Sequence, residues 1–305
     1  MSVIDRRDFI KSVSVVVGSA AVSGGAPVMA ALGEPAKAPR PDITYDVFAL
    51  KYLGPVNYKL AKALYQTGWA EDYKVNLYIW AIRNNKNSEV TLVDTGTDTV
   101  MGQKYVSLSP GAVFVPPAQL VARLGIQPEQ VTRVVLTHMH VDHVGGVVDF
   151  PKLYPKAQFF VQKKEFEFWV NSPLAQRPPF KMFGYDPGAQ AVADLAKTKR
   201  LTIVDGDQLI APAMEALFSL GHTPGLQSLL LPTAKGQTIV GSDIGHIFRN
   251  IKEDMPSGIV TDIAAWLLTY DKLRARAPLE NIFPGHDVRM ATDYPKVAED
   301  ITQLA

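Results

Sequence analysis

From residue 75 onward, the chain alternates short apolar runs with segments in which apolar residues recur at helical spacing. Residues 75–82 and 89–96 are rich in β-branched and aromatic residues, and the turn-forming sequence RNNKNS separates them. They therefore predict a β-hairpin. Residues 131–138 form a mostly apolar run of the kind that predicts a buried strand. Further strand-like runs occupy residues 157–162, 200–207, 214–222, 227–233, 236–243 and 280–287.

Helical patterns lie between these strand-like runs. Residues 116–125 begin with prolines and end at Gly125, which are common signals for the start and the end of a helix. Residues 172–200 have little clear period and predict an inserted loop region. Runs of strands with helices between them predict an α+β fold whose helices pack outside two sheets. Helical spacing also occurs in residues 163–171, 261–277 and 294–304.

Composition narrows the chemistry that such a fold could carry. The chain has 305 residues, of which 47% are hydrophobic and 20% charged, so it is long enough for one large core or two modest ones. Its formal net charge of +1 gives no basic surface for nucleic acid, and we expect no nucleic-acid partner. The sequence contains no cysteine, which excludes disulfides, thiolate ligands and a cysteine nucleophile. Any metal site must therefore use His, Asp or Glu.

The first 38 residues have the pattern of an export signal rather than of a folded domain. Arg6 and Arg7 precede a mildly apolar run that ends in small residues, which resembles a twin-arginine signal peptide. Glycines and Pro27 interrupt the run, so we expect no stable membrane insertion; a weak anchor or an unstructured tail is the alternative. The sequence thus predicts a signal at residues 1–38, one folded domain at residues 39–305, and export of the folded chain to the periplasm or the medium.

The sequence THMHVDH concentrates candidate metal ligands at the end of the predicted strand 131–138, and it contains three of the six histidines. Further histidines and an aspartate follow strand-like runs downstream, in the motifs GHTPG, VGSD and FPGHD. A single histidine is usually an ordinary core or surface residue. Five histidines beside glycine turns at strand ends indicate a metal centre instead. The candidate ligands are His138, His140, Asp142, His143, His222, Asp243 and His286.

The motifs DTG, THMHVDH, GHTPG, GSD and GHD, in this order, resemble those of the metallo-β-lactamase superfamily from about residue 45 to the end. The resemblance implies an αββα sandwich with two divalent metal ions, expected to be zinc, at one edge of its two sheets. It also implies that Asp94 of the DTG motif holds the ligand loops in place. The ligand assignment that it implies is His138, His140 and His222 for one metal, Asp142, His143 and His286 for the other, and Asp243 as the bridge between them.

A centre of this kind predicts hydrolysis. Two divalent metals lower the pKa of a bridging water, so that hydroxide is available near neutral pH to attack a carbonyl carbon or a phosphorus. We expect Asp142 to serve both as a ligand and as a proton acceptor. The sequence has no GxSxG elbow, which a serine hydrolase of the α/β type would carry.

Within the superfamily, THMHVDHVGG, GHTPGLQSLLL and FPGHDV are similar to motifs of N-acyl-homoserine lactone lactonases. This resemblance implies a quorum-quenching lactonase and is compatible with a homodimer. The bridging Asp243 argues against one β-lactamase branch, and the absence of cysteine argues against another. A thioesterase, an esterase or a weak β-lactamase stays open as the alternative.

One position departs from the lactonase pattern. The best-known lactonases have a tyrosine three residues after the bridging aspartate, where this chain has His246. We expect this imidazole to donate a hydrogen bond to the developing oxyanion or to protonate the leaving alkoxide, with a surface histidine as the alternative. Apolar residues in nearby segments would suit the wall of an acyl-chain pocket, with ordinary packing as the alternative. They are Trp69, Tyr73, Phe166, Phe168, Trp169, Phe180, Met182, Phe183 and Tyr185.

Overall fold

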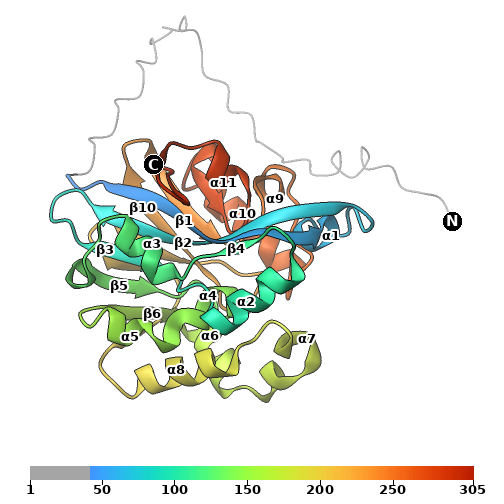
Figure 1. Cartoon of the computed structure of the whole chain (residues 1–305), viewed down its shortest axis with the longest axis horizontal. Coiled ribbons are helices and arrows are strands. Elements are labelled where there is room, and N and C mark those ends of the chain that lie inside the picture. Colours follow the sequence, from blue (N-terminus) through green and yellow to red (C-terminus); the bar gives the residue numbers. More distant parts are fainter. Residues whose placement is uncertain (1–41) are drawn as a thin grey trace, which may run out of the picture. The chain divides into compact units, whose positions relative to one another are not determined.

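The computed structural model describes residues 42–305, so the predicted signal at residues 1–38 and its boundary lie outside the described residues. In residues 42–305 two β-sheets stack with helices on their outer sides (Figure 1). The nine-stranded sheet contains β1 (Tyr45–Lys59), β2 (Asp72–Asn84), β3 (Val90–Val93), β4 (Val113–Phe114), β5 (Val131–Val135), β6 (Gln158–Gln162), β7 (Leu201–Val204), β13 (Lys296–Ala298) and β14 (Ile301–Gln303). The five-stranded sheet contains β8 (Gln208–Ala211), β9 (Met214–Phe218), β10 (Gln227–Thr233), β11 (Gly236–Ser242) and β12 (Ile282–Pro284).

Helices connect these strands in the described part of the chain. Of these, α2, α8 and α10 are the three longest. The segment that follows β6 is helical, as predicted, although its second part, Glu167–Asn171, is a π-helix. The α-helices are α1 (Leu60–Ala63), α2 (Thr99–Leu108), α3 (Pro117–Arg123), α4 (Val141–Val144), α5 (Phe150–Leu153), α6 (Lys163–Phe166), α7 (Pro178–Lys181), α8 (Asp186–Ala196), α9 (Phe248–Lys252), α10 (Ile263–Arg274) and α11 (Arg289–Thr292).

Both inner faces of the sheets share one apolar core. Trp80 and Val135 of the nine-stranded sheet are buried in the same cluster as Leu229 and Val240 of the five-stranded sheet. Buried apolar area of this kind is the main stabilising contribution to a fold, at roughly 25 cal/mol per Å². The sheets therefore pack face to face, with their alternating side chains interlocked.

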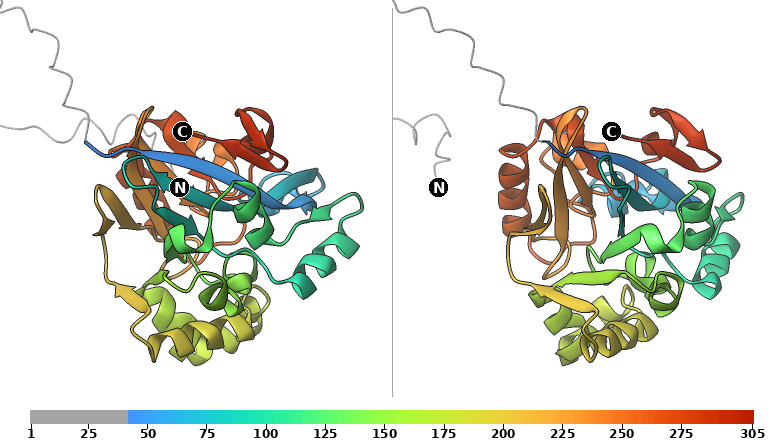
Figure 2. Two further views of the ribbon diagram at one scale, coloured as in Figure 1. Left: turned by 60° about the vertical axis from the view of Figure 1, so that its left-hand side comes forward. Right: turned by 90° about the vertical axis from the view of Figure 1, so that its left-hand side faces the viewer.

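Each outer face has its own cluster. Leu120 of α3 and Val192 of α8 pack against the outer face of the nine-stranded sheet. Trp266 and Tyr270 of α10 pack against the five-stranded sheet. Figure 2 shows, in its right-hand view, the strands between the orange-red α10 and the green α2 and α3. The predicted αββα sandwich is thus confirmed.

The topology brings the ends of several strands together. β3, β5, β6 and β7 run parallel to one another, and β12 runs parallel to β11. The carboxyl ends of parallel strands lie at the same edge of a sheet, so the loops that follow β3 and β5 are neighbours. The predicted hairpin is confirmed, since β2 and β3 pair antiparallel.

Two predictions of secondary structure are wrong. The region 172–200 is not a plain loop, because it contains α8, which begins with Pro187 in its first turn and buries Val192 and Leu195. Residues 294–304 do not form a helix, because β14 pairs antiparallel with β1 and β13 pairs with β14. Asp300 at the turn has a φ of 62°, a left-handed conformation that interrupts a helix.

Among residues 42–305, no helix combines the length and the apolar composition that crossing a membrane requires.

Candidate metal centre

All seven predicted ligands meet at one edge of the two sheets, on loops that follow strands. His138 and His140 follow β5, and Asp142 and His143 lie in the short helix α4. The other three follow strands of the second sheet: His222 follows β9, Asp243 follows β11 and His286 follows β12. The structure therefore brings every one of these residues to the place that the sequence predicted for them.

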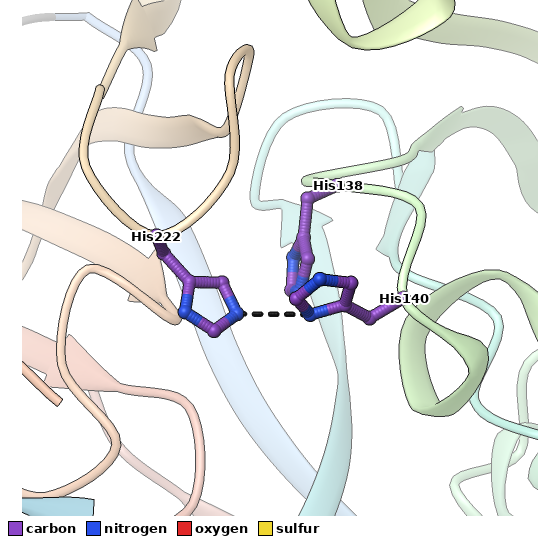
Figure 3. Close-up of side chains that lie close together, drawn as sticks. All are labelled: His138, His140 and His222. Atoms are coloured by element: carbon purple, nitrogen blue, oxygen red, sulfur yellow. Dashed lines mark hydrogen bonds between the residues drawn. The ribbon is translucent and has the colours of Figure 1, made fainter. Parts of the chain in front are cut away.

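Three histidines form the first group. The ligand atoms of His138, His140 and His222 all lie within 4.8 Å of one another, and all three side chains are buried. His140 Nδ1 and His222 Nε2 are 3.0 Å apart, and Figure 3 shows the two rings facing each other beside His138. Three imidazoles at this spacing form the ligand set that zinc often takes in proteins.

The second group combines one carboxylate with two histidines. Asp142, His143 and His286 also lie within 4.8 Å of one another. Asp243 stands between the two groups, with its Oδ2 3.4 Å from His222 Nε2 and 3.0 Å from His286 Nε2. Its Oδ1 is 3.4 Å from His143 Nε2. One carboxylate is therefore in reach of both histidine groups.

Unpartnered atoms show that the cluster suits cations. Within residues 42–305, His138 Nε2, His143 Nε2 and Asp243 Oδ1 are buried and make no hydrogen bond. Buried polar atoms almost always have a partner, so atoms that lack one need an explanation. Divalent cations between these atoms would satisfy all three, and imidazole with carboxylate is a donor set that such cations accept.

The electrostatics of the site favour the protonation states that ligands need at three histidines and at Asp243, but not at His143. Burial lowers the pKa of His143, yet Asp243, Asp142 and Asp94 raise it to about 10, so a cation must displace a proton there. Burial and the neighbouring imidazoles hold the pKa values of His138 and His140 well below their usual range, and burial lowers the pKa of His222 to about 3. Burial opposes ionisation of Asp243, but His286 and His143 keep its pKa well below the usual value. The three imidazoles are therefore neutral and the aspartate ionised at neutral pH, as metal binding requires.

Hydrogen bonds from Nδ1 fix the orientation of three of the candidate ligand rings. His143 Nδ1 donates to Asp94 Oδ2 at 2.7 Å. His222 Nδ1 lies 2.8 Å from the Ile259 carbonyl oxygen, and His286 Nδ1 lies 3.2 Å from the Asn76 carbonyl oxygen. Because each Nδ1 donates to an oxygen, each Nε2 is left free to bind a cation.

Gly285 allows the loop that carries His286 to approach Asp243 closely. A Cβ atom at this residue would lie 2.0 Å from Asp243 Oδ1. Any side chain here would therefore displace the carboxylate that stands between the two histidine groups.

His246 lies inside this cluster. Its side chain is 1% exposed, so the alternative of a surface histidine is wrong. Nε2 is 3.2 Å from Asp243 Oδ2, yet neither ring nitrogen makes a hydrogen bond within residues 42–305. Burial lowers the pKa of His246, which favours the neutral ring at neutral pH. This imidazole is close enough to His222 and Asp243 to bind a cation with them, a role that the sequence did not predict.

Sequence reasoning missed Glu165, whose carboxylate is fully buried. Its Oε1 accepts from Met139 N at 2.8 Å and Trp169 Nε1 at 2.7 Å. Its Oε2 accepts from Thr223 Oγ1 at 2.8 Å and Gly225 N at 2.9 Å. Glu165 thus joins the loop of His138 and His140 to the loop of His222.

Glu165→Gln should change the pH dependence of stability. Burial raises the pKa of Glu165 to about 7 from 4.5, against four hydrogen bonds that lower it. The unfolded state therefore releases this proton near pH 4.5 and the folded state near pH 7. Between those values the carboxyl group reduces the free energy of unfolding as pH rises, by on the order of 3 kcal/mol. Glutamine imitates the protonated form, so we expect the variant to lack this contribution.

Urea unfolding of the metal-free protein at pH 5 and pH 7.5 measures this difference. The matched control is Glu253→Gln, because Glu253 is a surface residue paired with Arg249 at 2.7 Å. The same pH dependence in wild type and Glu165→Gln would contradict the expected result.

Two cavities adjoin the cluster. The metal pocket, of about 100 Å³, is lined by His140, Asp142, Asp243, His246 and His286 together with Tyr58, Lys62 and Phe183. An adjoining cavity of about 360 Å³ is mostly apolar and includes Trp69, Tyr65 and Ala61. Lys62, Phe183 and Ile259 line both cavities.

Only some of the residues predicted for an acyl-chain wall line one of these cavities. Trp69 and Phe183 line the adjoining cavity, and Met182 lines the metal pocket. Trp169 packs edge-on against His140 instead, with ring centroids 5.5 Å apart. Ordinary packing accounts for the rest, since they contact the hydrophobic core: Tyr73, Phe166, Phe168, Phe180 and Tyr185.

A two-sheet sandwich with histidines and carboxylates gathered at one edge defines a class of metal-dependent hydrolases, and the comparison with known families agrees. Residues 75–286 match the Metallo-beta-lactamase superfamily, and the chain belongs to that superfamily. It is therefore a metal-dependent hydrolase, and its cluster of histidines and aspartates has the composition for two divalent cations.

Individual proteins similar to this chain are named as lactonases or lactone hydrolases, a narrower class than the superfamily. The N-acyl homoserine lactonase of Bacillus thuringiensis is 25% identical over 229 residues, which cover 70% of this chain and 83% of that protein. The N-acyl homoserine lactonase of a Bacillus sp is 24% identical over 176 residues, 55% of this chain, and the match spans 61% of that relative's length. A solved N-acyl homoserine lactone hydrolase, with N-hexanoyl-L-homoserine at its catalytic metal center, covers 83% of this chain and 97% of its own at 17% identity, with a TM-score of 0.64. This last likeness concerns the fold alone.

Proposed function

We propose that the protein is a lactonase that opens N-acyl-homoserine lactones or closely related lactones and thereby quenches quorum signals. The observation that carries the proposal is the apolar cavity of about 360 Å³ beside the metal pocket. A lactone ring in the metal pocket would leave its acyl chain in that cavity, where apolar area is removed from water. The lactonases that resemble this chain support the same substrate class.

The residues of the site would have different roles in the reaction. The seven predicted ligands would hold two divalent cations, for which we propose zinc; such cations, when bound, activate water and polarise a carbonyl oxygen. Asp142 lies at the open side of the cluster, with its Oδ2 3.7 Å from His286 Nε2. It is placed to accept a proton from water as the ring ester opens. His246 lines the same pocket, and its ring N–H would donate a hydrogen bond to a substrate oxygen on which negative charge develops.

Proton release with a panel of substrates tests the proposal. Opening of a lactone at neutral pH gives a hydroxy acid that ionises, so each turnover releases one proton. The panel contains short- and long-chain N-acyl-homoserine lactones, plain γ- and δ-lactones, a thioester and a cephalosporin. Chelator-sensitive opening of the acyl-homoserine lactones is expected. Turnover of the thioester or the cephalosporin with no lactone opened would overturn the lactonase proposal in favour of another hydrolase.

His246→Phe should keep both metals and lower lactone turnover by about 100-fold, because a positioned hydrogen-bond donor is lost while an aromatic ring is retained. Metal content and kcat are measured on the same preparation. Full metal content with unchanged kcat would remove His246 from the mechanism. A loss of metal would instead assign it to the ligands, as its 3.2 Å distance to Asp243 Oδ2 allows.

We also propose that the protein is exported through the twin-arginine route and acts in the periplasm or outside the cell as a homodimer. Support for export comes from the sequence pattern of residues 1–38, in which Arg6 and Arg7 precede a mildly apolar run that ends in small residues, and support for the dimer comes from the lactonase resemblance. Cell fractionation of the wild type and of Arg6→Lys/Arg7→Lys tests the route. Light scattering of the mature chain tests the dimer, and a monomer mass at working concentration would overturn it.

A further inference from the structure

A lysine without a charged partner stands between the two cavities. Lys62 lines the metal pocket and also the adjoining cavity. Its Nζ lies 3.8 Å from the centroid of the Tyr58 ring. Within residues 42–305 the ammonium makes no ion pair and no hydrogen bond, and the Lys62 side chain is partly buried. A cation–π contact of this kind supplies only part of what an ammonium loses when it leaves water.

The backbone around Lys62 is fixed, so the ammonium has a defined place. Gly258 N donates to the Lys62 carbonyl oxygen at 3.0 Å, and Tyr65 N donates to the Pro256 carbonyl oxygen at 2.8 Å. Asn250 Nδ2 donates to the Ala63 carbonyl oxygen at 2.9 Å. These bonds tie α1 to the segment that follows His246.

The acids in the metal pocket do not serve as partners for this ammonium. Asp142 and Asp243 line the same pocket, but both belong to the candidate ligand set, and Asp243 already lies between four imidazoles. With divalent cations bound, these two carboxylates would serve as ligands to the cations. Lys62 then has three N–H donors, and a molecule that occupies the two cavities can take the place of water as their acceptor.

We propose that Lys62 is a specificity-determining residue, whose ammonium donates a hydrogen bond to the amide carbonyl oxygen between the lactone ring and the acyl chain. The inference rests on the proposed lactonase function. With the ring in the metal pocket and the chain in the apolar cavity, the amide carbonyl is the polar group at the boundary, where Lys62 stands. The residue therefore selects lactones that carry an acylamino substituent over plain lactones of similar size.

The test compares two substrates on the metal-loaded enzyme. N-hexanoyl-homoserine lactone carries the amide, and α-hexyl-γ-butyrolactone places an alkyl chain on the same ring carbon without it. Lys62→Met keeps the length and loses the charge. We expect KM for the acyl-homoserine lactone to rise between about tenfold and about 100-fold with kcat nearly unchanged. We expect kcat/KM for the alkyl lactone to change less than about twofold, because it lacks the carbonyl acceptor.

Two further variants separate recognition from structure. Lys62→Arg restores a cationic donor and should recover part of the lost selectivity. Lys235→Met is the matched control, because Lys235 also lies over a tyrosine ring, Tyr294, at 5.3 Å, but at the β10–β11 turn, outside both cavities. It should behave as the wild type on both substrates.

Each outcome either supports or overturns the proposed role of Lys62. Selective loss on the acylamino lactone with unchanged metal content supports the inference. Equal loss on both substrates, or no loss on either, overturns it while leaving the lactonase proposal standing. A wild type that opens plain lactones alone also overturns it. A wild type that opens no lactone in the panel overturns the proposed function and, with it, this inference.

Discussion

Asp243→Asn is expected to lower turnover at least about 1,000-fold and to reduce the metal content of the chain. The Oδ2 atom of Asp243 lies 3.4 Å from His222 Nε2 and 3.0 Å from His286 Nε2, and its Oδ1 lies 3.4 Å from His143 Nε2. An asparagine has the same shape but no charge, and one of its two side-chain atoms is an amide nitrogen that does not bind cations. The variant would therefore lose the one carboxylate that both histidine groups share.

Metal analysis and proton-release kinetics on one preparation measure both effects. Wild-type activity should disappear with a chelator and return when divalent metal is added, whereas Asp243→Asn should stay inactive. The control is Asp293→Asn, a surface carboxylate paired with Arg289 at 2.7 Å. Unaltered metal content and turnover in Asp243→Asn would show that the centre does not depend on this carboxylate.

The cluster of candidate ligands could be predicted because its members lie in short sequence motifs. THMHVDH carries four candidate ligands within seven residues, and each remaining candidate follows a glycine by one or two residues at the end of an apolar run. A strand that ends in a glycine-containing turn places the next side chain at the edge of the sheet. This placement does not depend on which residues that side chain contacts in the folded protein. The prediction therefore needed local structure and the family resemblance, and no knowledge of long-range packing.

Residues that act through long-range contacts could not be predicted. Glu165 accepts from Met139 N, 26 residues earlier, and from Gly225 N, 60 residues later. Nothing beside Glu165 in the sequence marks it as buried. Lys62 is likewise one lysine among many in the sequence, and its place between two cavities depends on bonds to residues nearly 200 positions away.

The errors in the fold have the same origin. β1 is a strand of 15 residues, but Gly54 and Pro55 interrupt its pattern, and it keeps pairing with β2 through two register shifts. Residues 294–304 have helical spacing, yet pairing of Ile301 with Leu50 of β1 decides their conformation. Local propensity is a weak preference that tertiary pairing overrides at the edge of a sheet.

Asp94→Asn should weaken metal binding between about tenfold and about 100-fold and lower turnover further. Asp94 has a φ of 64°, and asparagine tolerates this left-handed conformation, so the backbone should be kept. The carboxylate accepts from Thr137 N at 2.7 Å through Oδ1 and from His143 Nδ1 at 2.7 Å through Oδ2. An amide oxygen can replace only one of these acceptors.

The backbone N–H of Thr137 decides which acceptor remains, because an N–H can only donate. In the Asp94→Asn variant the amide oxygen should therefore face Thr137, and the side-chain NH₂ group should face His143 Nδ1. That contact turns Nδ1 into an acceptor and moves the ring proton to Nε2, the atom that lies 3.4 Å from Asp243 Oδ1 and is needed for the cation. Competition with a coloured chelator measures the affinity, with exposed Asp271→Asn as the control. Excess metal should restore part of the activity, since the defect is one of tautomer and affinity. Wild-type affinity in Asp94→Asn would mean that Asp94 does not set the orientation of His143.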